Sequence, residues 1–128
     1  MSRILSILVV DDNLSMAKTL AEIMDVEGFE VHAAFSGAEA LEILRKERVD
    51  ILLTDVRMPD MNGVALYRQA RKTHPNLTTV LMTAYAADDI IQQGITEGIK
   101  TVLNKPLDME FLLSLFSAYK RLIIKEAP

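Results

Sequence analysis

The pattern of apolar and polar residues divides the chain into five apolar runs separated by longer amphipathic segments. Residues 51–53 are continuously apolar and too few for a typical helix, which indicates a strand covered on both faces of a parallel sheet. Residues 30–35 are more mixed, as expected for a strand at the edge of a sheet. The runs predict strands at residues 4–10, 30–35, 51–53, 79–82 and 100–104.

The segments between these runs carry helical periodicity and helix-capping residues. The first has apolar residues at i, i+4, i+7 and i+8, the spacing of one helical face. In the second, Ser36 and Glu39 form a capping-box pattern. The third helix is expected over residues 63–72, and the fourth, over 87–97, is expected to be weak because Gly94 interrupts it. The candidate caps are Asn13, Ser36, Asn62 and Asp108.

Strand and helix alternate five times, which predicts an α/β fold with a parallel sheet and helices on both faces. We expect right-handed crossovers and a flavodoxin-like (βα)5 three-layer sandwich whose five strands take the order 2-1-3-4-5. The predicted domain covers residues 1–122, and residues 123–128 are expected to be a C-terminal tail or the start of a linker.

Composition narrows the function classes. The 128 residues are 50% hydrophobic and 25% charged, which is typical of a globular domain. A net charge of −4 argues against direct binding of nucleic acid by this domain. The absence of cysteine excludes disulfides and thiolate sites. No apolar run approaches the roughly 20 residues of a membrane span, and the first one ends in Asp11 without a cleavage site. We expect a cytoplasmic domain with no membrane partner.

Polar residues stand where four of the predicted strands end. In the order 2-1-3-4-5, strands 1 and 3 are neighbours, so the carboxylates of Asp11, Asp12 and Asp55 are expected to converge at the switch point of the sheet. Carboxylates that converge in this way repel one another unless a cation lies between them, and a site made of oxygen ligands suits Mg²⁺. Lys105 then supplies a positive charge for an anionic ligand, and Thr83 supplies a hydroxyl donor. This set fits phosphoryl transfer to an aspartate. The alternative for Asp55 is a solvated aspartate in a loop.

These residues together resemble the receiver domain of two-component response regulators. The resemblance spans residues 4–122, and its motifs follow one another in order, each at a strand end. They are Val9-Val10-Asp11-Asp12, then Asp55 with Met58-Pro59 and Gly63, then Thr83-Ala84 and Lys105-Pro106.

The resemblance implies a role for each matching residue around the acidic cluster. Asp55 would be the phosphoacceptor, taking its phosphoryl group from a phosphohistidine on a sensor histidine kinase. Asp12 would bind Mg²⁺ directly and Asp11 through water, and the backbone carbonyl of Arg57 would be a further ligand beside Asp55. The domain would then be a signalling module rather than an enzyme, with self-catalysed phosphotransfer and autodephosphorylation.

The resemblance also implies phosphate contacts and a switch. Lys105 would pair with a phosphoryl oxygen, and its peptide bond to Pro106 is expected to be cis. The Thr83 hydroxyl and the Ala84 amide would donate to the phosphoryl group. Family members commonly carry an aromatic switch residue where this chain has Val102, so Tyr85 is a candidate replacement. A homodimer through the fourth helix, the fifth strand and the last helix is a further expectation.

Two other function classes remain open from the residues. An Mg²⁺-dependent phosphatase would carry a second carboxylate two residues after Asp55, where this chain has Arg57. A flavodoxin-like cofactor binder would need a phosphate loop after the first strand, where this chain has two aspartates. His32 and His74 are interpreted as ordinary edge-strand and helix-end residues, because no other ligands at metal-binding spacing accompany them.

Overall fold

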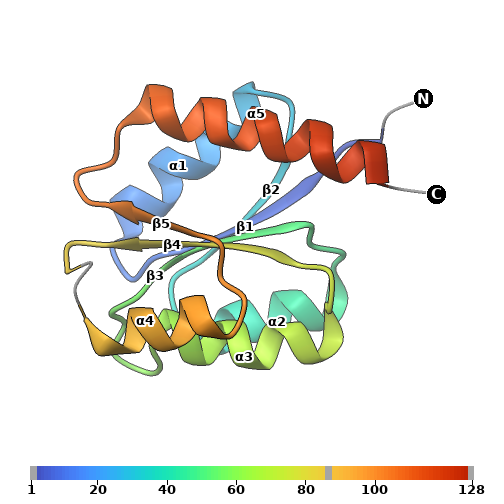
Figure 1. The fold of residues 1–128 in the computed structure, drawn as a ribbon. Helices are drawn as coiled ribbons and strands as arrows, with labels where there is room; N and C mark the ends of the chain where they lie inside the picture. The colour runs from blue at the N-terminus through green and yellow to red at the C-terminus, as the bar shows by residue number, and fades with distance from the viewer. Residues whose placement is uncertain (1–2, 86–87, 127–128) are drawn as a thin grey trace.

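The computed structural model describes residues 3–85 and 88–126 of the chain. Five parallel strands form one sheet in the order β2-β1-β3-β4-β5, which confirms the predicted flavodoxin-like topology (Figure 1). The strands are β1 (Ser6–Val10), β2 (Glu30–Ala34), β3 (Ile51–Asp55), β4 (Thr78–Thr83) and β5 (Thr101–Asn104). The helices are α1 (Leu14–Val26), α2 (Gly37–Lys46), α3 (Gly63–Thr73), α4 (Asp89–Thr96) and α5 (Met109–Glu126).

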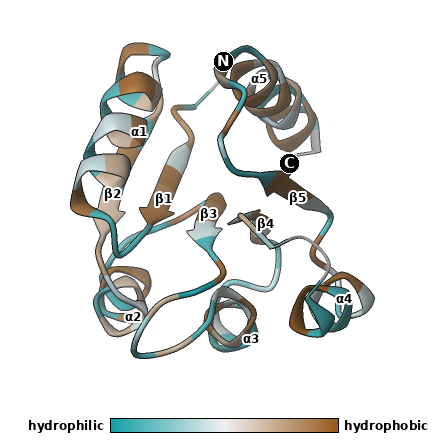
Figure 2. Ribbon diagram, turned by 90° about the vertical axis from the view of Figure 1, so that its left-hand side faces the viewer, coloured by the Kyte–Doolittle hydropathy of each residue, from teal (hydrophilic) through white to brown (hydrophobic). Residues whose placement is uncertain are grey.

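The helices form two layers, one on each face of the sheet. Helices α1 and α5 cover one face, and α2, α3 and α4 cover the other (Figures 1 and 2). The first layer packs around Phe116, whose fully buried ring meets that of Phe29 edge-on at 6.3 Å. In the second layer, Leu44 of α2 and Leu66 of α3 are buried against the sheet. Helices therefore cover both faces of the sheet and shield them from solvent, as the apolar central strands require.

Burial along the strands follows the sequence pattern. Every residue of β1 and of β3 is buried, whereas β2, at the edge of the sheet, is buried only at Ala34. All four predicted helix caps are confirmed. Their side-chain oxygens accept hydrogen bonds of 2.8–3.1 Å from the backbone amide three residues further on. These bonds satisfy amides that have no partner within the first turn of a helix.

Gly94 does not interrupt the fourth helix, so this part of the sequence interpretation is wrong. Helix α4 runs through Gly94, which is buried. A Cβ at this position would lie 2.8 Å from Cδ1 of Ile99 and 3.1 Å from Cγ2 of Val64. Glycine is needed here because α4 packs closely onto α3. The predicted start of this helix, at Ala87, lies outside the described residues.

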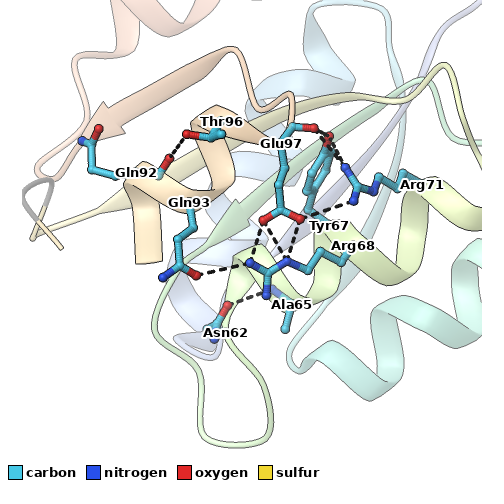
Figure 3. A network of polar contacts seen from close by, with 9 residues as sticks. All are labelled: Asn62, Ala65, Tyr67, Arg68, Arg71, Gln92, Gln93, Thr96 and Glu97. Atoms are coloured by element: carbon cyan, nitrogen blue, oxygen red, sulfur yellow. Dashed lines mark hydrogen bonds and ion pairs between the residues drawn. The ribbon is translucent and has the colours of Figure 1, made fainter. Parts of the chain in front are cut away.

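Glu97, just after α4, joins this helix to α3 (Figure 3). Its carboxylate accepts hydrogen bonds from Arg68 Nε at 2.9 Å and from Arg71 Nη2 at 3.3 Å. Its backbone carbonyl accepts a bond of 2.8 Å from the Tyr67 hydroxyl and one of 2.9 Å from Arg71 Nη1. The C-terminal end of α4 is therefore anchored by side chains of its neighbouring helix.

The last helix extends beyond the predicted end of the domain. Helix α5 continues to Glu126, and Ile123 and Ile124 are partly buried against the core. The predicted domain limit at residue 122 stays a prediction, but residues 123–126 are helical. Among the helices of the described residues, none combines the length and the apolar character that crossing a bilayer requires.

Candidate functional site

The register of the sheet brings the predicted acidic residues together. Val10 of β1 lies opposite Thr54 of β3, so Asp11 and Asp55 leave the sheet side by side. Asp11 is fully buried, and its Oδ1 accepts a hydrogen bond of 2.9 Å from the Asn13 amide. Asp55 is 8% exposed, and Asp12 is exposed. One carboxylate oxygen from each of the three aspartates lies within 4.8 Å of the others.

Lys105 completes this cluster from the other side. Thr83 of β4 pairs with Asn104 of β5, and the Lys105 amide donates a bond of 2.8 Å to the Thr83 carbonyl. The Lys105 ammonium lies 3.0 Å from Oδ2 of Asp11 and 3.5 Å from Oδ2 of Asp55. The Lys105–Pro106 peptide bond is cis, which confirms that expectation. The structure thus brings Asp11, Asp12, Asp55 and Lys105 into one site.

The electrostatics of the site leave negative charge in excess. Burial raises the pKa of the Asp55 carboxyl, and the charges of Asp11 and Asp12 add to this effect while Lys105 opposes it. Burial disfavours the Lys105 ammonium, but its hydrogen bond to Asp11 and the charge of Asp55 outweigh burial and raise the pKa of Lys105. The cluster therefore holds three carboxylates, and the one ammonium pairs with two of them, Asp11 and Asp55. A divalent cation would compensate the remaining charge, and an all-oxygen donor set fits Mg²⁺.

The loop after Asp55 depends on a close backbone approach. The Gly63 amide donates a bond of 2.8 Å to the Val56 carbonyl, and a Cβ on Gly63 would collide with the Asp55 carbonyl oxygen. Asp60 accepts hydrogen bonds from the Gly37 and Ala38 amides at 3.1 and 2.9 Å, which ties the loop to the start of α2. Sequence reasoning missed Asp60, because this capping residue comes from 23 positions away.

Three of the predicted phosphate-contacting and switch residues lie at the end of β4: Thr83 is its last residue, and Ala84 and Tyr85 follow it. Thr83 is buried, and its Oγ1 accepts a hydrogen bond of 2.9 Å from the Tyr85 amide. Ala84 is exposed. The Tyr85 side chain points outward with 61% of its surface exposed, and the Arg57 guanidinium lies 5.2 Å from its ring centre. Tyr85 as a switch stays a prediction.

An ion pair beside the site was missed from the sequence. Arg57, beside the acidic cluster, also forms an ion pair with Asp88, which precedes α4. Val102 is half-buried and packs against the apolar cluster that contains Val56 and Leu81. No local pattern marks the pair of Arg57 and Asp88, since the two residues are 31 positions apart.

A family model described as the response regulator receiver domain matches residues 7–117. The chain belongs to this family. It is a receiver domain of two-component response regulators, a signalling domain that acts as phosphoacceptor and not a classical enzyme. Membership decides against the phosphatase and the cofactor binder. Receiver domains partner with histidine kinases and bind Mg²⁺ at an acidic pocket, which corresponds to the acidic cluster of this chain.

Individual relatives agree with the family assignment. The chain is 44% identical over 108 residues to a response regulator receiver protein of Anaeromyxobacter sp. (strain Fw109-5), covering 84% of this chain and 45% of that one. It is 35% identical over 104 residues to sporulation initiation phosphotransferase F of Bacillus subtilis (strain 168), covering 81% and 84%. The chain spans between 23% and 29% of several matched transcriptional regulators.

A solved structure has the same fold along nearly the whole chain. The crystal structure of a CheY-like receiver domain protein from Methanospirillum hungatei JF-1 superposes with a TM-score of 0.91 and 27% sequence identity. The match covers 98% of this chain and 100% of that one. This receiver domain therefore shares its fold with that structure along nearly its whole length.

Proposed function

We propose that Asp55 accepts a phosphoryl group from the phosphohistidine of a sensor histidine kinase. The observation that carries the proposal is the position of the Lys105 ammonium, 3.0 Å from Asp11 and 3.5 Å from Asp55, beside three clustered carboxylates. A structural aspartate does not need two acidic neighbours. A carboxylate that attacks a phosphoryl group needs positive charge around it, which Lys105 and a bound cation provide.

The reaction is catalysed by this domain itself. A carboxylate oxygen of Asp55 attacks phosphorus, the bond from phosphorus to the histidine nitrogen breaks, and an aspartyl phosphate forms. Lys105 pairs with a phosphoryl oxygen, and the Thr83 hydroxyl and the Ala84 amide donate hydrogen bonds to the others. Hydrolysis of the aspartyl phosphate by water ends the signal. The reaction needs no base, because Asp55 acts as a carboxylate anion.

The acidic cluster would hold Mg²⁺ through Asp55, Asp12 and the backbone carbonyl of Arg57, with Asp11 acting through water. When bound, Mg²⁺ supplies charge that stabilises the phosphoryl oxygens. The contacts of the two aspartates support this division. Both oxygens of Asp11 already accept hydrogen bonds, from the Asn13 amide and from Lys105, whereas Asp12 is exposed at the rim.

Phosphorylation would act by changing which partners the domain binds. Movement of Thr83 toward the phosphoryl group breaks its bond with the Tyr85 amide. That change is transmitted to α4, β5 and α5, the face through which a homodimer or a downstream partner would dock. Phosphorylation shifts this equilibrium only by its different affinity for the two arrangements.

Phosphate incorporation tests the acceptor directly. Incubation with acetyl phosphate and Mg²⁺ is expected to add one phosphoryl group per chain, measured by intact-mass spectrometry at neutral pH. Asp55→Asn should abolish incorporation. Asp60→Asn is the matched control, since Asp60 lies in the same loop and its amide replacement still offers a capping oxygen. Full incorporation in the Asp55→Asn variant would identify another acceptor.

A further inference from the structure

A second cluster of metal-ligating side chains lies far from Asp55, at the opposite edge of the sheet. Glu30 is the first residue of β2 and pairs with Ser6, the first residue of β1. His32 follows two positions later, so both side chains project from the same face of the strand. Ala34 continues that face and is buried in the cluster that includes Leu44 of α2. Glu30 and His32 therefore face α2.

The third member of the cluster comes from the end of α2. Glu47 is the C-cap of this helix. One ligand atom each from Glu30, His32 and Glu47 lies within 4.8 Å of the other two. The sequence interpretation found no companion ligand for His32 at metal-binding spacing, but the folded chain places two carboxylates beside it. That interpretation considered neighbours along the chain, whereas the crossover through α2 brings Glu47 back from 15 positions away.

The imidazole of His32, one of the three cluster residues, gives a further observation at the level of a single atom, although its side chain is 24% exposed. Its Nε2 atom is inaccessible to solvent and has no hydrogen-bond partner among the described residues. It lies 3.4 Å from Oε1 of Glu30, but not in the geometry of a hydrogen bond. A buried polar atom without a partner is costly, and native structures rarely leave one so. A metal ion between the nitrogen and the two carboxylates would satisfy it.

The donor set selects the metal. Two carboxylates balance the charge of a divalent cation, and an imidazole nitrogen favours Zn²⁺ over Mg²⁺, which prefers six oxygen ligands. Zinc bonds of about 2.1 Å at tetrahedral angles place neighbouring ligand atoms about 3.4 Å apart. The distance from Nε2 of His32 to Oε1 of Glu30 is 3.4 Å. We propose that Glu30, His32 and Glu47 form a Zn²⁺ site that is separate from the acidic cluster, with water as the remaining ligand.

A metal ion at this site would stabilise the edge strand β2. Strand β2 has a neighbour on only one side, β1, and its first residue is exposed. A metal shared by β2 and the end of α2 ties that strand to the helix beside it. Zn²⁺ that binds the folded chain and not the unfolded chain raises stability by mass action. The site is independent of Asp55 and of the proposed phosphorylation.

Calorimetric titration with ZnCl₂ tests the proposal, and saturating Mg²⁺ in the buffer would compete with Zn²⁺ for the acidic cluster. His32→Gln and Glu47→Gln should each weaken Zn²⁺ binding at least about tenfold. Glu47→Gln guards against a folding defect, since Glu47 is exposed. Glu27→Gln, an exposed glutamate outside the cluster, is the matched control and should bind like the wild type. Unchanged affinity in His32→Gln and Glu47→Gln would overturn the proposal.

Nuclear magnetic resonance gives a second readout that does not depend on affinity. The chain has only two histidines, so their imidazole nitrogen signals are readily assigned with a His74→Gln variant. Zn²⁺ should shift the Nε2 signal of His32 far more than that of His74, which contacts the proposed ligand residue Glu47 only through its backbone carbonyl, at 3.4 Å. A shift confined to His74, or no imidazole shift at all, would show that His32 forms only an ordinary ion pair with Glu30.

Discussion

The Lys105 ammonium donates a hydrogen bond of 3.0 Å to Oδ2 of Asp11, which joins the ends of β5 and β1 across 94 positions of sequence. Asp55 lies between these two strand ends, with its Oδ2 3.5 Å from the same ammonium. The one cation of this cluster is thus shared by two buried carboxylates. Removing the ammonium or one of the two carboxylates is expected to change both the stability of the fold and the reactivity of Asp55.

Lys105→Met should destabilise the fold at neutral pH, because it leaves Asp11 and Asp55 buried without positive charge. Breaking a buried pair of this kind costs up to about 3–5 kcal/mol, and the partial exposure of Lys105 places this case below that range. Adding Asp55→Asn should restore part of the loss. The four chains of this double-mutant cycle are compared by urea unfolding without divalent cations. Strictly additive effects would show that the two residues are not coupled.

Asp12→Ala should lower Mg²⁺ affinity more than Asp11→Ala, because only Asp12 is expected to bind the ion directly. Isothermal titration calorimetry with MgCl₂ measures both constants. Asp25→Ala serves as the control, since Asp25 is exposed on α1 and remote from the cluster. Equal losses in the two cluster variants would contradict the proposed division of roles.

Arg3→Ala should lower stability at neutral pH but have little effect in acid. Burial opposes ionisation of Asp50, but hydrogen bonds from Arg3 and from the Ser6 amide outweigh it and hold the pKa of Asp50 below its usual value. The resulting stability is fully present above the unfolded-state value of about 3.9 and is lost as pH falls through the lower folded-state pKa.

Urea unfolding of the wild type and of Arg3→Ala from pH 7 down to pH 3 measures this contribution. The difference in the free energy of unfolding should stay constant near neutrality and shrink as the pH approaches the acid range. Asp50→Asn should remove the same pH dependence. A difference between the two chains that is equal at every pH would mean that the ion pair is not its source.

Gly94→Ala should destabilise the domain, although alanine stabilises an exposed helix by about 1 kcal/mol relative to glycine. The added methyl group would press on Ile99 and Val64, and such overpacking costs roughly 1–3 kcal/mol. Thermal unfolding followed by circular dichroism measures the change. Gly28→Ala is a useful contrast, because nothing lies within 4 Å of its added methyl group and only its positive φ of 94° opposes the substitution. A stabilised Gly94→Ala variant would contradict the tight packing of α4.

Beryllofluoride with Mg²⁺ mimics the aspartyl phosphate and should alter amide hydrogen exchange in residues 84–105 and in α5. The Glu97 contacts anchor the end of α4 to α3, so the largest changes are expected near the start of α4 rather than at its end. Mass spectrometry of peptides with and without the mimic gives the comparison. Asp55→Asn is the control and should show no change. Changes confined to α1 and α2 would refute the proposed output face.

The sequence by itself determined the strands, the caps and the members of the acidic site. Buried strands follow from continuous apolar runs. Caps follow from a Ser, Asn or Asp just before a helical segment, whose side-chain oxygen can accept a hydrogen bond from an amide in the first turn. The site could be assembled from the sequence because parallel strands end at the same edge of a sheet. The residues after β1, β3 and β5, Asp11, Asp55 and Lys105, must then meet once the strand order is known.

Only the tertiary structure decided how separate elements contact one another. Asp60 reaches the start of α2, Glu97 binds two arginines of α3, and Gly94 is a packing requirement rather than a helix breaker. The group of Glu30, His32 and Glu47 likewise exists only after α2 has folded back beside β2. Such contacts depend on the distance and rotation between packed elements, and no periodicity within a single element encodes these quantities.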